Sequence, residues 1–428
     1  MRPALERILF PAVRLAAVLG LLLILGSLAF AAERHGVVVD AVTGQPIAGA
    51  VLTLDGMVSL SDARGEFRIA EAEAPLMVRA VGYERETIPA GRAGTIRLKP
   101  LQPKSLYLTV YGIGAAFLRD PALDVIQRNN LNALVIDLKG DRGLIPFPSS
   151  QTLAEKGGAL KLRTIPDLKQ LVADLKARGV YLIARLVVFK DDPLANARPD
   201  WAIRTAGGAI WKDREGLAWI DPFRREAWNY TLGVAEEAAA AGFDEIQFDY
   251  VRFPDAIGLT FSQPTTEATR VAAITGFLAE AKRRLARYNV FVAVDIFGYA
   301  CWNRDDTGIG QRIEDLADVV DYISPMLYPS SFQFGIPGYR NPVASPYEIV
   351  HLSLEQAKAR TQGKPAHYRP WLQAFPDYAF GGQKFGPDEI GKQIQAARDS
   401  GTVGWMLWNP RNVYTPNDFR AEPATAGR

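Results

Sequence analysis

Residues 245–254 read Glu245-Ile246-Gln247-Phe248-Asp249-Tyr250-Val251-Arg252-Phe253-Pro254. Apolar and polar side chains alternate at its start, which predicts a β-strand whose two faces meet different surroundings. If Ile246 and Phe248 face a layer of helices, Gln247 and Asp249 face the other way. A carboxylate buried near the carboxyl end of such a strand is costly unless it has a partner or a function.

Strands of this kind recur along the chain, and helical stretches separate most of them. We predict eight strands, at Leu106–Tyr111, Ala133–Leu138, Tyr181–Phe189, Glu245–Val251, Phe291–Phe297, Tyr322–Tyr328, Tyr368–Phe375 and Val403–Trp408. Predicted helices are Ile165–Arg178, Arg224–Ala241, Glu267–Tyr288, Pro346–Thr361 and Pro387–Ser400. This alternation is typical of a (β/α)8 TIM barrel. A doubly wound open sheet is the alternative, but no glycine-rich phosphate loop follows the first strand.

Polar residues are expected to converge on the carboxyl-terminal mouth of this barrel. In the fifth strand Asp295 faces inward, and in the second strand Asp137 and Lys139 do. The remaining strands contribute a cation, amide and aromatic groups, namely Arg185, Tyr328, Gln373 and Trp408. Three carboxylates and two cations would therefore share one mouth.

Paired carboxylates at a mouth are what glycoside hydrolysis needs, because one exchanges a proton with the leaving group and the other attacks the sugar or activates water. Asp249 and Asp295 are the first choice for this pair, with Asp137 as the alternative partner. The competing interpretation for each is a structural ion pair with Arg185 or Arg252. Substrate would be positioned by Gln247, Arg185, Arg252, Tyr328, Gln373, Trp408 and Trp302.

Aromatic residues are frequent in the segments that follow the predicted strands. Flat rings suit sugar rings, whose C–H groups pack on them. An individual ring is more often local packing, so the concentration on one rim is the informative feature. These rim residues are Trp201, Trp211, Trp219, Tyr299, Trp302, Phe332, Phe334, Tyr339, Tyr378 and Phe380.

Residues 33–100 have a different, all-β pattern of short strands between Gly, Pro and Asp turns. Two stretches, Gly36-Val37-Val38-Val39-Asp40-Ala41-Val42-Thr43-Gly44-Gln45-Pro46-Ile47-Ala48-Gly49-Ala50 and Ser61-Asp62-Ala63-Arg64-Gly65-Glu66-Phe67, resemble the carboxypeptidase regulatory-like domain. The resemblance implies a small transthyretin-like β-sandwich that acts as a spacer or docking module. Pro100-Leu101-Gln102-Pro103 then forms a linker.

Residues 1–32 have the three-part pattern of a secretory signal. Arg2, Arg7 and Arg14 precede the apolar run from Leu15 to Phe30, and Ala29-Phe30-Ala31 offers small residues at a cleavage site. An uncleaved membrane anchor is the alternative. Either way, the rest of the chain is predicted to be exported, to the periplasm or the cell exterior.

The composition bears on whether nucleic acid, a metal or another cofactor is a partner. The 428 residues carry a net charge of +2 and no block of Lys and Arg, which argues against nucleic acid. The single cysteine, Cys301, and three widely spaced histidines match no zinc pattern, so neither a metal nor another cofactor is expected.

Four stretches of the barrel together resemble a known bacterial family. They are residues 133–139, 245–254, 292–298 and 321–329. The chain is similar over about residues 104–420 to a domain family described as glycosyl hydrolase. The resemblance implies a barrel distantly similar to the α-amylase-like hydrolases, with Asp249 at the nucleophile position. Asp295 stands where that pattern has a Glu acid/base, and Gln247 replaces its Arg.

The predicted organisation is a signal or anchor (1–32), a β-sandwich (33–100), a barrel (101–420) and a tail (421–428). The predicted function is hydrolysis of a cell-envelope or extracellular polysaccharide. The rival hypotheses are a non-catalytic carbohydrate-binding barrel, an envelope scaffold, and metal-assisted hydrolysis with aspartate ligands.

Overall fold

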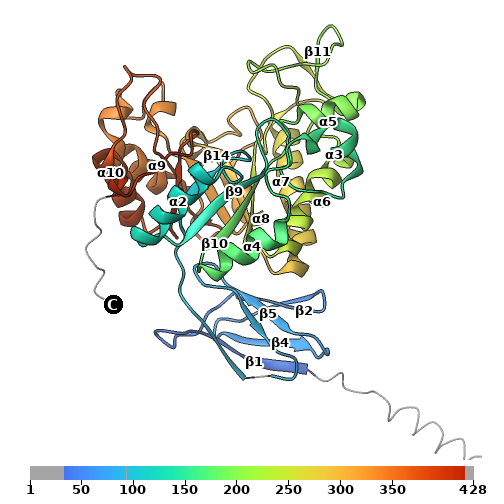
Figure 1. Cartoon of the computed structure of the whole chain (residues 1–428), viewed down its shortest axis with the longest axis vertical. Coiled ribbons are helices and arrows are strands. Elements are labelled where there is room, and N and C mark those ends of the chain that lie inside the picture. The colour runs from blue at the N-terminus through green and yellow to red at the C-terminus, as the bar shows by residue number, and fades with distance from the viewer. Residues whose placement is uncertain (1–32, 93, 420–428) are drawn as a thin grey trace, which may run out of the picture.

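The computed structural model describes residues 33–92 and 94–419, which form a small β-sandwich and a larger barrel (Figure 1). The predicted signal or anchor (1–32) and tail (421–428) lie outside the described residues. Within the described part, no helix is both long and apolar enough to cross a membrane.

The barrel is closed by parallel pairing all the way round. Its strands are β8 (Lys104–Leu108), β9 (Ala133–Lys139), β10 (Tyr181–Val187), β12 (Glu245–Asp249), β14 (Phe291–Phe297), β15 (Tyr322–Met326), the split pair β16 (His367–Tyr368) and β17 (Trp371–Gln373), and β18 (Trp405–Trp408). They are ordered β14-β12-β10-β9-β8-β18-β17-β15, and a β14–β15 pairing completes the circle. The predicted (β/α)8 barrel is confirmed, and closure excludes the open-sheet alternative.

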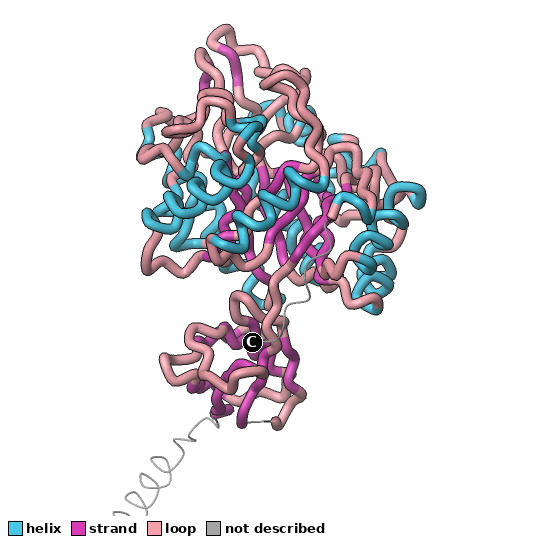
Figure 2. Tube along the Cα trace, turned by 90° about the vertical axis from the view of Figure 1, so that its left-hand side faces the viewer, coloured by secondary structure: helices cyan, strands magenta, loops and turns pink. Residues whose placement is uncertain are grey.

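Helices surround the strands, as Figure 2 shows. The five predicted helices are present as α4 (Leu168–Ala177), α6 (Arg225–Ala241), α7 (Glu267–Leu285), α9 (Pro346–Arg360) and α10 (Pro387–Asp399). Gly242 ends α6 in the left-handed conformation, with φ 110°. Four further helices were not predicted from the sequence. They are α2 (Ala116–Arg128), which has Pro121 in its second turn, and the short α3 (Thr152–Gly157), α5 (Asp192–Ala197) and α8 (Ile313–Val319).

Side-chain alternation sorts the barrel into an interior and an outer layer. Ile246 and Phe248 pack in the outer core beneath the helices, whereas Tyr107, Ile183 and Trp371 belong to the interior cluster. Lys139 departs from the prediction. The β9–β10 register shifts beside it, so Lys139 leaves the inward face and pairs with the buried Asp191 at 2.7 Å.

The sandwich encloses its own apolar core. One sheet holds β4 (Glu66–Ala70), β1 (Glu33–Asp40) and β7 (Gly94–Leu98), and the other holds β3 (Met57–Leu60), β2 (Val51–Leu54), β5 (Leu76–Arg79) and β6 (Glu86–Ile88). Val38, Leu52 and Val78 are fully buried between the sheets. The all-β prediction is confirmed, and the assignment to the carboxypeptidase regulatory-like family stays a prediction.

The sandwich contacts the amino-terminal end of the barrel. Arg85 lies 2.6 Å from Asp244, which directly precedes β12, and donates to the carbonyl of Asn289, two residues before β14. Thr53 donates to the carbonyl of Ala286 at 3.3 Å. The carboxyl ends of the strands therefore point away from the sandwich (Figure 1).

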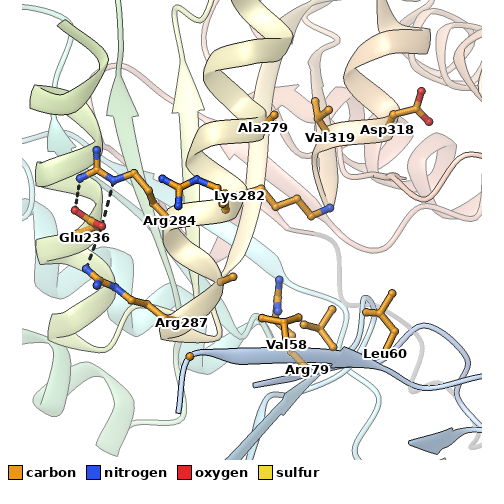
Figure 3. Close-up of a pocket in the computed structure, with 14 residues that line it drawn as sticks. Val58, Leu60, Arg79, Glu236, Ala279, Lys282, Arg284, Arg287, Asp318 and Val319 are labelled. Atoms are coloured by element: carbon orange, nitrogen blue, oxygen red, sulfur yellow. Dashed lines mark hydrogen bonds and ion pairs between the residues drawn. The ribbon is translucent and has the colours of Figure 1, made fainter. Parts of the chain in front are cut away.

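A cavity of about 880 Å³ lies at this junction, between β3 and α7 (Figure 3). Its walls carry several cations, but most of these already have acidic partners. Arg284 and Arg287 both pair with Glu236, and Lys282 lies 3.3 Å from Asp321. We assign this cavity to domain packing, because its charges are matched and it lies at the end opposite the predicted mouth.

Candidate active site

Arg185 is the centre of the polar cluster at the carboxyl end of the barrel. It extends inward from β10 and is 1% exposed. Its Nη1 donates to Asp137 at 2.7 Å, and its Nε and Nη2 donate to Asp249 Oδ2 at 3.0 and 2.5 Å. Nη2 also donates to Asp141 at 2.9 Å, and Nε lies 3.8 Å from Asp295. One guanidinium thus gathers four carboxyl groups.

Desolvation and repulsion between neighbouring carboxylates favour the neutral form of a carboxyl group that is buried in such a cluster. Burial raises the pKa of Asp137 to about 6, against the opposing effect of Arg185. Burial, followed by repulsion from Asp249, raises the pKa of Asp295 well above its usual range. Of the carboxyl groups in this cluster, Asp137 and Asp295 are therefore the two whose surroundings favour the protonated form.

Each carboxyl group has a distinct environment. Asp249 accepts from Arg185 and, at 2.6 Å, from the Tyr250 backbone N–H, a donor set that suits an anion. Asp137 also accepts from the Tyr107 hydroxyl at 2.6 Å. Asp295 Oδ1 accepts from the Trp371 indole at 2.8 Å, whereas its buried Oδ2 has no hydrogen-bond partner among the described residues. An unpartnered buried oxygen is again what a protonated acid would present.

A cavity of about 200 Å³ opens above this cluster. Five of the predicted site residues line it, namely Asp249, Arg185, Arg252, Tyr328 and Trp408. Its other lining residues are Asp141, Tyr250, Phe297, Met326 and Trp371. The floor is thus acidic and the walls are mostly aromatic, a combination that suits a sugar ring held against a carboxylate.

The other predicted residues do not line this cavity. Asp137, Asp295 and Gln247 lie in the barrel interior beneath it, where Gln247 donates to Ser324 at 3.2 Å. Gln373 uses its side chain to hold Ser330 and the carbonyl of Phe375. Trp302 donates to Ser353 of α9 at 2.9 Å, outside the barrel interior. Gln373 and Trp302 therefore have structural partners where substrate contacts were predicted.

Asp141 is the acidic residue that the sequence analysis missed. It follows β9 by two residues and is 38% exposed, so it presents a carboxylate to the cavity from the loop. Its only sequence signal was its position directly after a predicted strand, in Lys139-Gly140-Asp141. Trp371 was also missed as a lining residue, although it lies within a predicted strand.

Tyr250 makes a sharp turn immediately after Asp249. Its φ is 50°, in the left-handed region that a bulky residue adopts only at a cost. The turn aims its backbone N–H at the carboxylate of Asp249 and places its ring in the cavity wall. Its position is therefore coupled directly to that of the central carboxylate.

The predicted aromatic rim residues differ in exposure, and two of them, Trp211 and Trp219, line a groove beside the cavity. Trp201, Trp219 and Phe332 are buried within the loops, while Phe334 and Tyr378 are exposed. Two of the long loops meet in a small antiparallel pair, β11 (Arg204–Thr205) with β13 (Leu259–Thr260), near the top of Figure 1. Within residues 33–92 and 94–419, no group of three or more His, Cys, Asp or Glu side chains could hold a metal ion.

Comparison with known proteins supports the barrel fold and assigns its family. Residues 105–414 match the model of the family described as "Putative glycosyl hydrolase domain". No curated protein matches the chain. The glycoside hydrolase domain of PgaB (BpsB) from Bordetella bronchiseptica superposes with a TM-score of 0.53 at 16% identity, covering 73% of this chain and 95% of that one. This likeness supports the barrel fold.

A hypothetical protein from Ruminiclostridium thermocellum is 32% identical, covering 44% of this chain and 96% of that one, with a TM-score of 0.39. The family match extends over nearly the whole barrel and contains the strands that supply Asp137, Arg185, Asp249 and Asp295. The chain therefore belongs to this family of glycosyl hydrolase domains.

Proposed function

We propose that the protein hydrolyses O-glycosidic bonds of a cell-envelope or extracellular polysaccharide at the cavity above Arg185. The observation that carries the proposal is Asp249, an ion-paired carboxylate that lines an aromatic-walled cavity at the carboxyl end of β12. In this proposal Asp249 is the nucleophile, or the base that activates water.

The proton donor has two candidates. Asp295 is the predicted partner and has the raised pKa that a general acid needs, but it is completely buried below the cavity. Asp141 reaches the cavity directly. We propose that Asp295 is the acid if substrate binding opens the floor, and Asp141 if the floor stays closed.

The separation of the carboxyl groups bears on stereochemistry. Asp141 and Asp249 both accept from Arg185 Nη2, at 2.9 and 2.5 Å, so the two acceptor oxygens cannot be further apart than the sum of these distances. That limit lies below the separation of about 6.5–9.5 Å that is typical of inverting enzymes, and it is compatible with the shorter separation of about 5–5.5 Å in retaining enzymes. If Asp141 is the partner of Asp249, retention of anomeric configuration is expected.

The primary test is reducing-end release from a panel of bacterial envelope polysaccharides and exopolysaccharides, with wild type beside Asp249→Asn. Asp305→Asn, in an exposed loop after β14, is the matched control. We expect turnover by wild type and control, and a loss of at least about 10³-fold in a folded Asp249→Asn protein. Equal turnover in all three would refute the role of Asp249. Glycan binding without turnover would favour the carbohydrate-binding alternative.

Asp141→Asn and Asp295→Asn then separate the two candidate acids. Loss of the general acid slows cleavage of a poor leaving group far more than that of an activated nitrophenyl glycoside, which departs without protonation. The variant that shows this split identifies the acid. A variant that slows both substrates equally has lost a positioning residue instead.

We also propose export across the cytoplasmic membrane, on the basis of the Arg-rich start and apolar run in residues 1–32. Expression of the full chain followed by fractionation tests this. Recovery of a shortened protein in the periplasm or medium supports cleavage, recovery in the membrane supports anchoring, and recovery in the cytoplasm refutes export.

A further inference from the structure

Arg252 lies in the wall between two cavities. One is the cavity above Arg185, and the other is an adjoining open groove of about 710 Å³. Among the described residues, only Arg252 and Tyr250 line both. The guanidinium of Arg252 lies between the two, because it contacts the ring of Trp219, which lines the groove, and that of Phe297, which lines the cavity.

The guanidinium of Arg252 is surrounded by rings. Its central carbon lies 4.8 Å from the centroid of Trp219, 5.2 Å from that of Tyr250 and 4.8 Å from that of Phe297. These contacts hold the planar group in place and offset part of its desolvation, by about 0.5–2 kcal/mol for a cation–π contact. The side chain is thus pre-organised, with little rotamer entropy left to lose on binding.

The described residues place no carboxylate within ion-pair distance of Arg252. Its one protein hydrogen bond runs from Nη1 to the carbonyl of Phe253 at 3.0 Å. Asp249 is already bound by Arg185, and Asp255 and Asp213 act on Arg252 only at longer range. Burial lowers the pKa of Arg252, which means that its positive charge is incompletely compensated.

The other charges of the groove are matched or exposed. Lys190 lies 2.9 Å from Glu215 and 3.5 Å from Asp213, and Lys212 lies 3.5 Å from Asp192. Arg214 is exposed to solvent and has no ring contact within the described part of the chain. Arg252 is therefore the groove cation that is both partly buried and without an acidic partner.

A guanidinium offers parallel N–H groups that match the two oxygens of a carboxylate or a phosphate. We infer that Arg252 binds an oxyanion substituent on the substrate, next to the sugar held over Asp249, so that the enzyme prefers an acidic polysaccharide. This inference rests on the proposed function and specifies its substrate class. The substituent is the carboxylate of a uronic acid or a phosphate on a sugar hydroxyl.

Matched probes isolate the charge. Binding is measured by calorimetry with full-chain Asp249→Asn protein, which should hold substrate without turnover. The probes are oligogalacturonate against its methyl ester, and a phosphorylated oligomannose against the same sugar after phosphatase treatment. We expect at least tenfold tighter binding of the charged member of one pair, which also identifies the source of the anion.

In the Asp249→Asn background, Arg252→Met should abolish the preference for the charged probe, and Arg252→Lys should weaken it. Arg214→Met is the matched control, and we expect it to change the preference by less than twofold. A cooperative thermal unfolding transition close to that of the parent protein checks that each variant is folded. If Arg252→Met does not fold, Arg252→Lys still decides the test.

Equal binding of charged and neutral members, binding of no probe, or a preference that survives Arg252→Met would overturn the inference. Its failure is distinguishable from failure of the proposed function. Turnover of neutral glycans alone would leave a hydrolase without an anion subsite. A charge preference that depends on Arg252 in a wild-type protein without turnover would leave the subsite and remove the hydrolase.

Discussion

The barrel holds a buried arginine near each end, and the two have different surroundings. At the amino-terminal end Arg369 pairs with the single carboxylate of Glu245, to which Tyr181 also donates. Val81 of the sandwich packs against the interior at this end. At the other end Arg185 faces four carboxyl groups and borders a cavity. A buried ion pair alone therefore does not indicate a functional site. An excess of carboxyl groups over cations beside a cavity is the feature that sets the carboxyl-terminal end apart.

Removal of Arg185 should have the largest effect, because it leaves several carboxyl groups without their cation. We expect Arg185→Met to destabilise the fold by about 3–5 kcal/mol at pH 7. The pKa values of Asp137 and Asp295 are already raised, and they should rise further without Arg185. A raised pKa makes the folded state hold protons that the unfolded state releases, so stability falls as pH rises.

Urea unfolding at pH 5 and pH 7 measures this effect. The loss of stability relative to wild type should be clearly smaller at pH 5. A loss that is the same at both values would mean that Arg185 acts through packing and not through charge.

Glu245→Gln should destabilise the fold by about 3 kcal/mol, because Arg369 is then buried without an anion. Adding Arg369→Met should restore much of that loss. Since this pair lies away from the cavity, turnover per folded molecule should not change. A fall in turnover comparable to that of Asp249→Asn would contradict the distinction between the two ends.

Asp137→Asn should change how stability depends on pH. Burial raises the pKa of Asp137 to about 6 in the folded protein, above the ordinary value of about 3.8. Its contribution to wild-type stability is therefore greatest below about pH 4 and is lost as pH rises towards 6, by at most about 3 kcal/mol. The free energy of unfolding, measured by urea denaturation at pH 4.5, 5.5 and 6.5, should fall less steeply with pH in Asp137→Asn than in wild type. Equal slopes in the two proteins would refute the raised pKa of Asp137.

Arg85→Ala should have the smallest effect. The ion pair with Asp244 is partly exposed, and Lys176 also lies 2.6 Å from that carboxylate and would remain. We expect a loss below about 1 kcal/mol and unchanged turnover. A loss of several kcal/mol would show that the sandwich stabilises the barrel more strongly than its contacts indicate.

Much of the barrel could be predicted from the sequence, because alternation in a strand has a strict period of two. From this period, the side chains of Asp137, Arg185, Asp249 and Asp295 were predicted to point into the barrel, as they do in the structure. It failed at Lys139, where a register shift that leaves no local sequence signal reverses the direction of the side chain.

Depth along the barrel axis could not be predicted. Whether a carboxylate lines a cavity or lies beneath it depends on large side chains from strands far away in the sequence. Trp371 donates to Asp295, and Trp408 stacks on Tyr107 with ring centroids 4.0 Å apart. Asp141 was missed for a related reason, since the position of a loop residue is set by tertiary contacts such as that with Arg185.

The left-handed backbone of Tyr250 implies a compromise between durability and activity. A glycine at this position would adopt the same φ without strain, so Tyr250→Gly would relieve local cost while opening the wall shared by both cavities. The strained φ accompanies an aromatic ring, which glycine lacks, in the wall that the two cavities share. Selection for thermostability alone would be expected to discard this tyrosine early, and selection for turnover to restore it.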